Sequence, residues 1–135
     1  MIENVIVMKN VFRNDTANPM TPVVEGVTFD TTNSLQNLYK LINTDIVEHL
    51  NVKVNDKEYD FWFDEEGKLK EGVKPTYPLF YEGKLHDIIF GNIVVTKSNE
   101  EGEITGIPDE EFDSLVKSLE KDLLKLAKFP LEKFF

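Results

Sequence analysis

The sequence predicts an α+β fold, in which an antiparallel or mixed sheet of five to six strands packs with two helices. Several short segments are rich in β-branched and aromatic residues and alternate with polar ones, as strands do. Two other segments, residues 32–43 and 109–128, place apolar side chains at helical spacing instead. The order expected along the chain is therefore hairpin, helix, hairpin, further strand and helix.

Length and composition predict a single domain over residues 1–135. A chain of 135 residues, 41% of them hydrophobic, can bury a core without a metal or a disulfide. Within this domain we expect an N-terminal β hairpin (1–30), a core (31–128) and an apolar C-terminal tail (129–135).

The N-terminal hairpin is expected to join two strands through a wide loop. Residues 2–12 and 23–30 are rich in β-branched side chains, which favour strands. Between them, residues 14–22 hold asparagine, aspartate, threonine and two prolines, a composition typical of loops.

The first helix is expected over residues 32–43. Asn33 is a candidate N-cap, and Gln36 three residues later completes a variant of the capping box. Asn43 can end the helix because asparagine tolerates the left-handed conformation. Leucine and isoleucine side chains between these residues form one apolar stripe, as expected of a helix that covers a sheet.

A second hairpin is expected from residues 45–54 and 58–64, joined by the two-residue turn Asn55-Asp56. Alternation along its second strand places three aromatic residues inward and Trp62 outward among acids: Tyr59, Phe61 and Phe63 inward, and Asp60, Trp62 and Asp64 outward. Trp62 has two interpretations. Either a second layer covers this face and buries the ring, or the ring contacts a ligand or a partner.

Three further segments complete the predicted sheet. Residues 64–68 are expected to form a tight type I turn with Gly67 in the left-handed position. Residues 74–81 contain two prolines, so we expect them to be irregular or an edge strand. The nearly continuous apolar run 85–96 is expected to be the most buried strand.

The second helix is expected after a polar loop over residues 97–108. Pro108 suits the first helical position, and the acids that follow it lie where the helix dipole favours negative charge. The apolar face of this helix is expected to pack on the sheet, with Leu115, Leu119 and Leu123 beside Phe61, Ile89 and Ile93.

The C-terminal tail, residues 129–135, is unusually apolar for a chain end. Four apolar side chains left in water would form a sticky patch: Phe129, Leu131, Phe134 and Phe135. We therefore expect the tail to be covered, either by the chain's own sheet or by a second copy in a homodimer.

The charge balance bears on the class of partner. The chain has 25 acidic and 15 basic residues, and a net charge of −10. This balance argues against direct binding to a nucleic acid, where lysine and arginine must replace counterions. It favours a partner with a basic surface, or the acids serve only to keep the protein soluble. There is no cysteine, no apolar run long enough for a transmembrane helix and no signal-peptide pattern, so a cytoplasmic location is expected.

The strongest charge feature is the segment 100–113. It contains seven acids and no base: Glu100, Glu101, Glu103, Asp109, Glu110, Glu111 and Asp113. One interpretation is a solvated loop followed by acids that suit a helix N-terminus. The other is a surface that docks on a basic partner or imitates the phosphates of a nucleic acid, with the first three acids on a mobile loop and the rest fixed on a helix.

No motif in the chain dictates a chemistry. Glycine-rich phosphate loops and serine-nucleophile motifs are absent, and two histidines without cysteine make a poor zinc ligand set, so neither a metal nor a cofactor is expected. We therefore expect a binding module rather than an enzyme. Two alternatives remain: a metal-dependent hydrolase or transferase that uses Asp64, Asp87 and magnesium, and a small-ligand or nucleotide sequestering protein with Trp62, Tyr77 and Tyr81 as stacking surfaces.

Four motifs together carry a family resemblance: Ser34-Leu35-Gln36-Asn37-Leu38 in the first helix, the expected hairpin Phe63-Asp64-Glu65-Glu66-Gly67-Lys68-Leu69, the strand that opens Asp87-Ile88-Ile89-Phe90, and the acidic helix start Pro108-Asp109-Glu110-Glu111-Phe112. Over residues 23–119 the chain resembles the small domains of phages and mobile elements grouped as domain of unknown function 3846. The resemblance implies a phage or mobile-element origin and an accessory role. It implies no activity and no catalytic residue.

These observations predict a non-catalytic accessory protein in the cytoplasm of a bacterial host. It would bind and inhibit a host protein that serves in defence or handles nucleic acid. Such a host protein presents a basic groove, to which the acids of the 100–113 segment are complementary.

Overall fold

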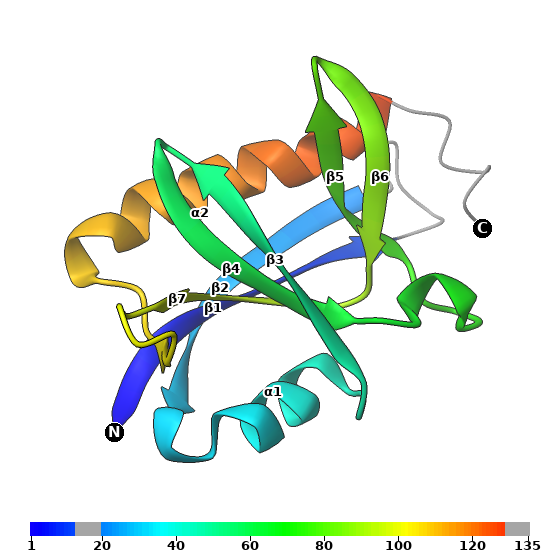
Figure 1. The fold of residues 1–135 in the computed structure, drawn as a ribbon. Coiled ribbons are helices and arrows are strands. Elements are labelled where there is room, and N and C mark those ends of the chain that lie inside the picture. Colours follow the sequence, from blue (N-terminus) through cyan, green and yellow to red (C-terminus); the bar gives the residue numbers. More distant parts are fainter. Residues whose placement is uncertain (13–19, 129–135) are drawn as a thin grey trace.

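The computed structural model describes residues 1–12 and 20–128 (Figure 1). The described elements, in chain order, are β1 (Ile2–Phe12), β2 (Met20–Asp30), α1 (Ser34–Ile42), β3 (Val47–Val54), β4 (Lys57–Asp64), β5 (Pro75–Tyr81), β6 (Lys84–Phe90), β7 (Ile93–Ser98), β8 (Ile104–Thr105) and α2 (Asp109–Leu124). Short 3₁₀ turns occupy Thr31–Asn33, Gly67–Leu69 and Lys125–Lys128. The architecture is α+β, as the sequence predicts.

The main sheet is antiparallel throughout. Its strands lie in the order β2-β1-β7-β4-β3, and β8 pairs with β7. The expected N-terminal hairpin is present, with β1 and β2 paired along their whole length. β5 and β6 form a separate two-stranded antiparallel sheet.

The main sheet lies between the two helices, with α1 on one face and α2 on the other (Figure 1). On the α2 face, Phe61 is fully buried in a cluster with Leu115, Leu119 and residues of β5 to β7, as expected from the sequence. On the α1 face, Val94 packs with Leu38 and Ile42. Each helix therefore covers the sheet through most of the apolar stripe that its sequence spacing predicts, although Leu35 at the start of α1 is 49% exposed.

The apolar run 85–96, expected as one strand, is two strands in two different sheets. β6 ends at Phe90 and β7 begins at Ile93. Gly91 between them has a φ of 84°, a left-handed conformation that glycine adopts without the clash of a Cβ atom. The chain turns there, which sends β6 to pair with β5 and places β7 in the middle of the main sheet.

The segment after β4 also differs from its expected form. Glu65 and Glu66 form a turn as predicted, but no hairpin follows it, because residues Gly67–Leu69 continue as a 3₁₀ turn. Gly67 is buried and does not have a positive φ. A Cβ atom on Gly67 would lie 3.0 Å from the carbonyl oxygen of Phe90, so this glycine permits a close approach of two chain segments rather than a left-handed turn.

The predicted helix and turn ends are confirmed in part. Asn33 makes no side-chain capping hydrogen bond, and the Asp30 carboxylate instead accepts the N–H of Thr32 at 2.9 Å. Asn43 ends α1 in the left-handed conformation, as predicted. The predicted turn after β3 is also present, since Asn55 and its neighbour Asp56 both have positive φ.

Prolines mark the start of two further elements, β5 and α2. Within residues 74–81, which were expected to be irregular or an edge, Pro75–Tyr81 forms β5, with register shifts against β6. Pro108 directly precedes α2 as its N-cap, and the first turn of α2 carries three acids. The apolar tail predicted over residues 129–135 lies outside the described residues, and so does most of the loop predicted over residues 14–22.

Candidate partner-binding site

The first acids of the 100–113 segment lie on a hydrogen-bonded turn between β7 and β8. Asn99 Oδ1 accepts the backbone N–H of Glu101 at 3.0 Å and of Glu103 at 2.9 Å. Asn99 Nδ2 donates to the Glu103 carboxylate at 3.1 Å. The first three predicted acids therefore lie on a turn that is held by hydrogen bonds of Asn99.

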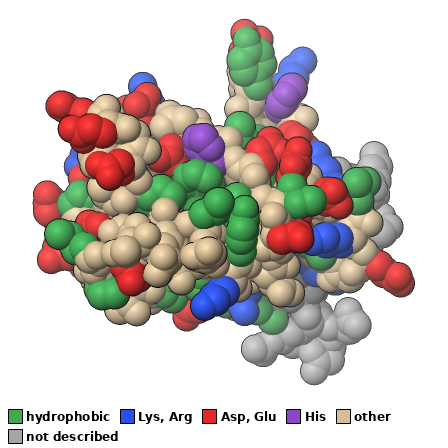
Figure 2. All heavy atoms as spheres, turned by 60° about the horizontal axis from the view of Figure 1, so that its bottom comes forward, with side chains coloured by type: hydrophobic (Ala, Val, Ile, Leu, Met, Phe, Trp, Pro, Cys, Tyr) green, Lys and Arg blue, Asp and Glu red, His purple; other side chains and the backbone are tan. Residues whose placement is uncertain are grey.

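Six of the seven predicted acids are exposed: Glu100, Glu101, Glu103, Asp109, Glu110 and Asp113. The turn between β7 and β8 and the start of α2 lie at the same end of the molecule, on the left in Figure 1. Figure 2 shows acidic side chains gathered along that left edge. The fold therefore concentrates the acids of this segment at one end.

Glu111 differs from the other six acids, because only 8% of its surface is exposed. Its carboxylate accepts the hydroxyl of Tyr59 at 2.6 Å and the ammonium of Lys97 at 3.0 Å, and Lys57 lies 3.9 Å away. Because Glu111 is buried and its carboxylate is already bonded within the fold, the prediction that Glu111 contacts a partner is wrong. Helical periodicity turns this acid toward the sheet, where it holds α2 against β4 and β7.

The hydrogen bond from Tyr59 lowers the pKa of Glu111, and the positive charges of Lys97 and Lys57 add to this effect against the opposing effect of burial. Burial and the neighbouring Glu111 carboxylate raise the pKa of Tyr59. Glu111 is therefore an ionised structural group that is neutralised by its neighbours, and it adds little to the negative field of the surface.

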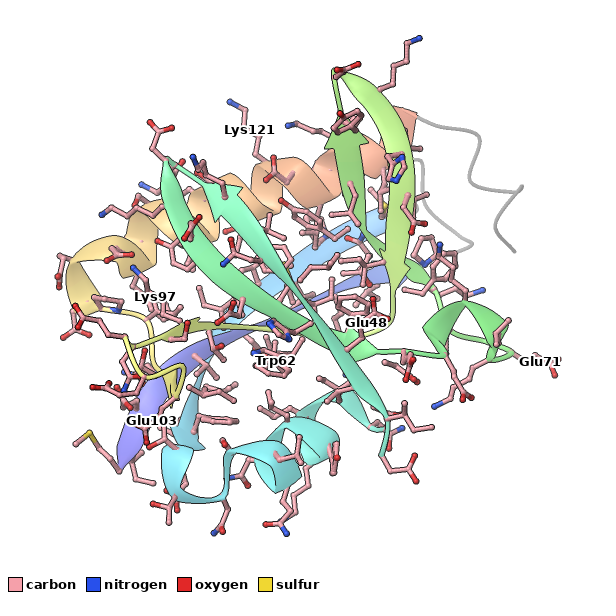
Figure 3. All side chains as sticks on the ribbon, in the orientation of Figure 1. Glu48, Trp62, Glu71, Lys97, Glu103 and Lys121 are labelled. Carbon is pink, nitrogen blue, oxygen red and sulfur yellow. The ribbon has the colours of Figure 1, made fainter. Side chains whose placement is uncertain are left out.

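An open hollow of about 750 Å³ lies beside the acidic turn. It lies between the β7–β8 turn, the start of β1, the start of α1 and the neighbouring strands β3 and β4. Its side chains include Glu3, His49, Asp60, Trp62 and Glu103. Figure 3 shows Trp62 below the sheet on the side of α1, and Glu103 on the turn at the left.

Trp62 is partly buried and lines this hollow, so the interpretation that a second layer covers the ring is met in part, and contact with a ligand or a partner stays a prediction. α1 covers its face of the sheet, and the ring packs against the cluster around Leu38. The indole Nε1–H donates to Thr96 Oγ1 at 2.9 Å. His49, across the β3–β4 pairing, stacks on the ring with centroids 4.6 Å apart and planes inclined by 25°. The pair gives the hollow a flat aromatic wall.

Asp60 is the functional candidate that sequence reasoning missed. Only 7% of its surface is exposed, yet its side chain lines the hollow, and no described residue donates a hydrogen bond to it or pairs with it. Its oxygens are not among the buried atoms that lack a partner, so the carboxylate opens onto the hollow. A mostly covered carboxylate that faces an open hollow is a candidate for ligand recognition. The sequence feature that could have indicated Asp60 is its position two residues before Trp62, which places both side chains on the same face of β4.

The other two predicted stacking residues do not join Trp62. Tyr77 is 5% exposed, its ring packs edge-on against Phe61, and its hydroxyl donates to Asp122 at 2.8 Å. It is a core residue on the α2 face, so the prediction of a ligand-stacking role for Tyr77 is wrong. Tyr81 is exposed at the tip of the β5–β6 hairpin beside His86, away from the hollow.

Asp64 and Asp87, predicted for the magnesium alternative, line a smaller hollow of about 170 Å³. Each already has a lysine partner: Lys70 for Asp64 at 2.5 Å, and Lys68 for Asp87. Burial alone would raise the pKa of both carboxyls, but their lysines and backbone N–H donors outweigh burial and hold both pKa values below the ordinary range. A metal ion would have to displace both lysines.

Two further findings concern the described part of the chain. No cluster of three or more histidine, aspartate or glutamate side chains there could hold a metal ion. No helix within residues 1–12 and 20–128 is long and apolar enough to cross a membrane.

A family model with the description "Domain of unknown function (DUF3846)" matches residues 16–120. The chain belongs to the DUF3846 family. The DUF3846 match begins at residue 16, before β2, and runs through most of α2, so it includes all seven predicted acids together with Asp60 and Trp62. Glu3 of β1 lies outside it. No curated protein and no solved structure matches the chain.

Proposed function

We propose that this DUF3846 protein is a non-catalytic binding module that docks through its acidic end on a protein with a basic surface and inhibits it. The observation that carries this proposal is the concentration of exposed acids on an ordered turn and a helix start, beside an open hollow that contains Trp62. An acidic surface raises the association rate with a basic partner and competes with the partner's natural anionic ligand.

The setting we propose is the cytoplasm of a bacterial host, in which the protein serves a phage or a mobile element. The target would be a host protein that serves in defence or handles nucleic acid, because such proteins expose basic grooves. Support comes from the family resemblance and from the net charge of −10, which disfavours direct contact between this chain and a nucleic acid.

The test is affinity capture from a bacterial lysate with a charge-reversed variant and a matched control. The variant changes Glu100, Glu101 and Glu110 to lysine, because all three are exposed and none accepts a described hydrogen bond through its side chain. The control makes the same change at exposed acids away from this end: Glu71, Glu82 and Glu120. Figure 3 places Glu71 opposite to Glu103.

Both variants change the net charge equally, so they separate a located surface from overall charge. We expect the wild-type protein and the control to capture the same basic protein, and the Glu100, Glu101 and Glu110 variant to lose it while its thermal melt stays unchanged. Capture of identical proteins by all three would contradict the acidic surface as the docking site.

A second candidate function, the sequestering of a small ligand, is favoured by the size of the Trp62 hollow. Its charged side chains are acids, Glu3, Asp60 and Glu103, and neither lysine nor arginine lines it. This lining disfavours a nucleotide phosphate and favours an organic cation. Mass spectrometry of the molecules that stay bound after incubation with nucleotide and polyamine pools distinguishes the two classes, since bound nucleotide would contradict the electrostatic argument.

A further inference from the structure

We propose that the hollow beside Trp62 is a subsite for the guanidinium group of an arginine side chain presented by the basic partner. Asp60 would pair with the guanidinium, and the Trp62–His49 stack would support its flat face. This inference rests on the proposed function and specifies the residue type by which the partner is recognised.

Asp60 carries the argument. Its surface is 93% covered by the fold, and among the described residues none donates to its carboxylate. Among the described residues, Asn10 Oδ1 is the buried side-chain atom that lacks a hydrogen-bond partner, so the oxygens of Asp60 reach the open hollow. There the carboxylate can accept hydrogen bonds, and its partner would be a cation or a hydrogen-bond donor that enters through the hollow.

The aromatic wall decides between arginine and lysine. Trp62 and His49 stack with planes inclined by 25°, and both line the hollow together with Asp60. A guanidinium is planar, stacks on aromatic rings and offers two parallel N–H donors to one carboxylate. An ammonium is compact and strongly hydrated, so it gains less from the same surroundings.

The acidic side chains around the hollow disfavour an anionic ligand and connect the subsite to the acidic end. Met1 also lines the hollow, and its N-terminal ammonium lies 3.5 Å from the carboxylate of Asp30. Glu103 lines the hollow and also belongs to the acidic turn, so one partner can contact both. Glu3 accepts the backbone N–H of Gly106 at 3.2 Å, and Glu103 accepts Asn99 Nδ2, but neither has a described cation partner. The hollow therefore keeps negative charge that a cationic side chain from the partner would neutralise.

The experiment titrates the protein with a short peptide, acetyl-Lys-Gly-Arg-Gly-Lys-amide. Trp62 is the only tryptophan of the chain, so its indole fluorescence and N–H resonance report on this site directly. Peptides with lysine or citrulline in place of the arginine are matched probes, because citrulline keeps the shape and loses the charge. Agmatine tests a free guanidinium compound against one presented by a peptide.

The arginine peptide is expected to shift the Trp62 signals saturably and to bind at least about tenfold more tightly than the other three probes. Asp60→Asn should weaken its binding by at least about tenfold, while Glu71→Gln, an exposed acid at the opposite end of the molecule, changes it by less than about twofold. Asp60→Asn should also leave the melting temperature nearly unchanged, since no described residue pairs with the Asp60 carboxylate, which opens onto the hollow. A purely structural Asp60 would lower it.

Several outcomes overturn the proposal. Equal binding of the lysine peptide would reduce the site to a general cation site, and agmatine binding as tight as that of the arginine peptide would assign it to a small molecule. No shift of the Trp62 signals with any probe would remove the subsite. If Asp60→Asn still captures the lysate partner that the Glu100, Glu101 and Glu110 variant loses, the arginine subsite fails and the proposed function stands. If both variants still capture the lysate partner, the arginine subsite and the proposed function fail together.

Discussion

The hydroxyl of Tyr59 on β4 donates a 2.6 Å hydrogen bond to the buried carboxylate of Glu111 on α2. Lys97 on β7 donates to the same carboxylate, so one acid connects the second helix to two neighbouring strands of the sheet. This hydrogen bond distinguishes Glu111 from the other acids of the 100–113 segment. Glu111 stabilises the fold, and its exposed neighbours remain available to a partner.

Tyr59→Phe should lower the free energy of unfolding by about 1.5 to 3 kcal/mol, the usual contribution of a hydrogen bond to a charged group. Tyr77→Phe is the matched control, because its hydroxyl donates to the more exposed Asp122, and it should cost about 0.5 to 1.5 kcal/mol. Urea unfolding measures both. Equal losses for the two variants would mean that the burial of Glu111 adds nothing to its bond with Tyr59.

Acid should remove the stabilisation due to Glu111. Its folded-state pKa lies below the ordinary value of 4.5, so its contribution is complete above that value and is lost as the pH falls through the folded-state pKa. Glu111→Gln should therefore cost about 2 kcal/mol at neutral pH and much less near pH ~2, where the wild-type carboxyl is also neutral. Urea unfolding over this pH range measures the difference, and a constant difference would contradict the assignment.

Phe61→Ala should cost about 3 to 5 kcal/mol, as large-to-small changes of fully buried aromatic residues do. Phe61 is at the centre of the α2 face and packs edge-on against Tyr77, so the cavity cannot close by a local movement. Thermal and urea unfolding measure the loss. A melt close to that of the wild type would contradict the position of this residue in the core.

Alternation and helical spacing predicted the centre of the core from the sequence, although they did not assign Tyr77 to it. Phe61 and Leu115 meet because a period of two in β4 and a period near 3.6 in α2 each select one buried face. The split of the run 85–96 could not be predicted in this way. Apolar residues continue on both sides of Gly91, and only the tertiary structure shows that the two halves pair with different strands.

Gly91→Ala tests this break. The left-handed φ of 84° should make alanine unfavourable by about 1 to 2 kcal/mol, and the new Cβ atom would lie 3.3 Å from Val73. Gly83→Ala is the control, because Gly83 has a similar φ of 78° with open space around it. Gly91→Ala should therefore be the more destabilising of the two in urea unfolding. The reverse order would show that packing at Gly91 is not tight.

The candidate site was predicted less completely than the core, for a related reason. The charge count locates the acids of 100–113, but only the direction of each side chain separates Glu111 from Glu110. Asp60 shows the converse. It is an ordinary outward acid in the sequence, and it becomes distinctive because β7, α1 and the acidic turn enclose it without providing a partner.

The dependence of partner binding on salt concentration should distinguish the contribution of the exposed acids from that of Asp60. Exposed acids act at long range and are screened, so the affinity of the wild-type protein should fall by at least about tenfold between about 50 mM and 500 mM salt. Neutralising Glu100, Glu101 and Glu110 to glutamine should flatten this dependence. Asp60→Asn should instead lower the affinity by a similar factor at every salt concentration, because a buried pair is screened much less. Surface plasmon resonance with the captured partner measures the affinity of the three proteins at each salt concentration. If Asp60→Asn flattens the salt dependence as much as the triple variant does, Asp60 acts as one more surface charge.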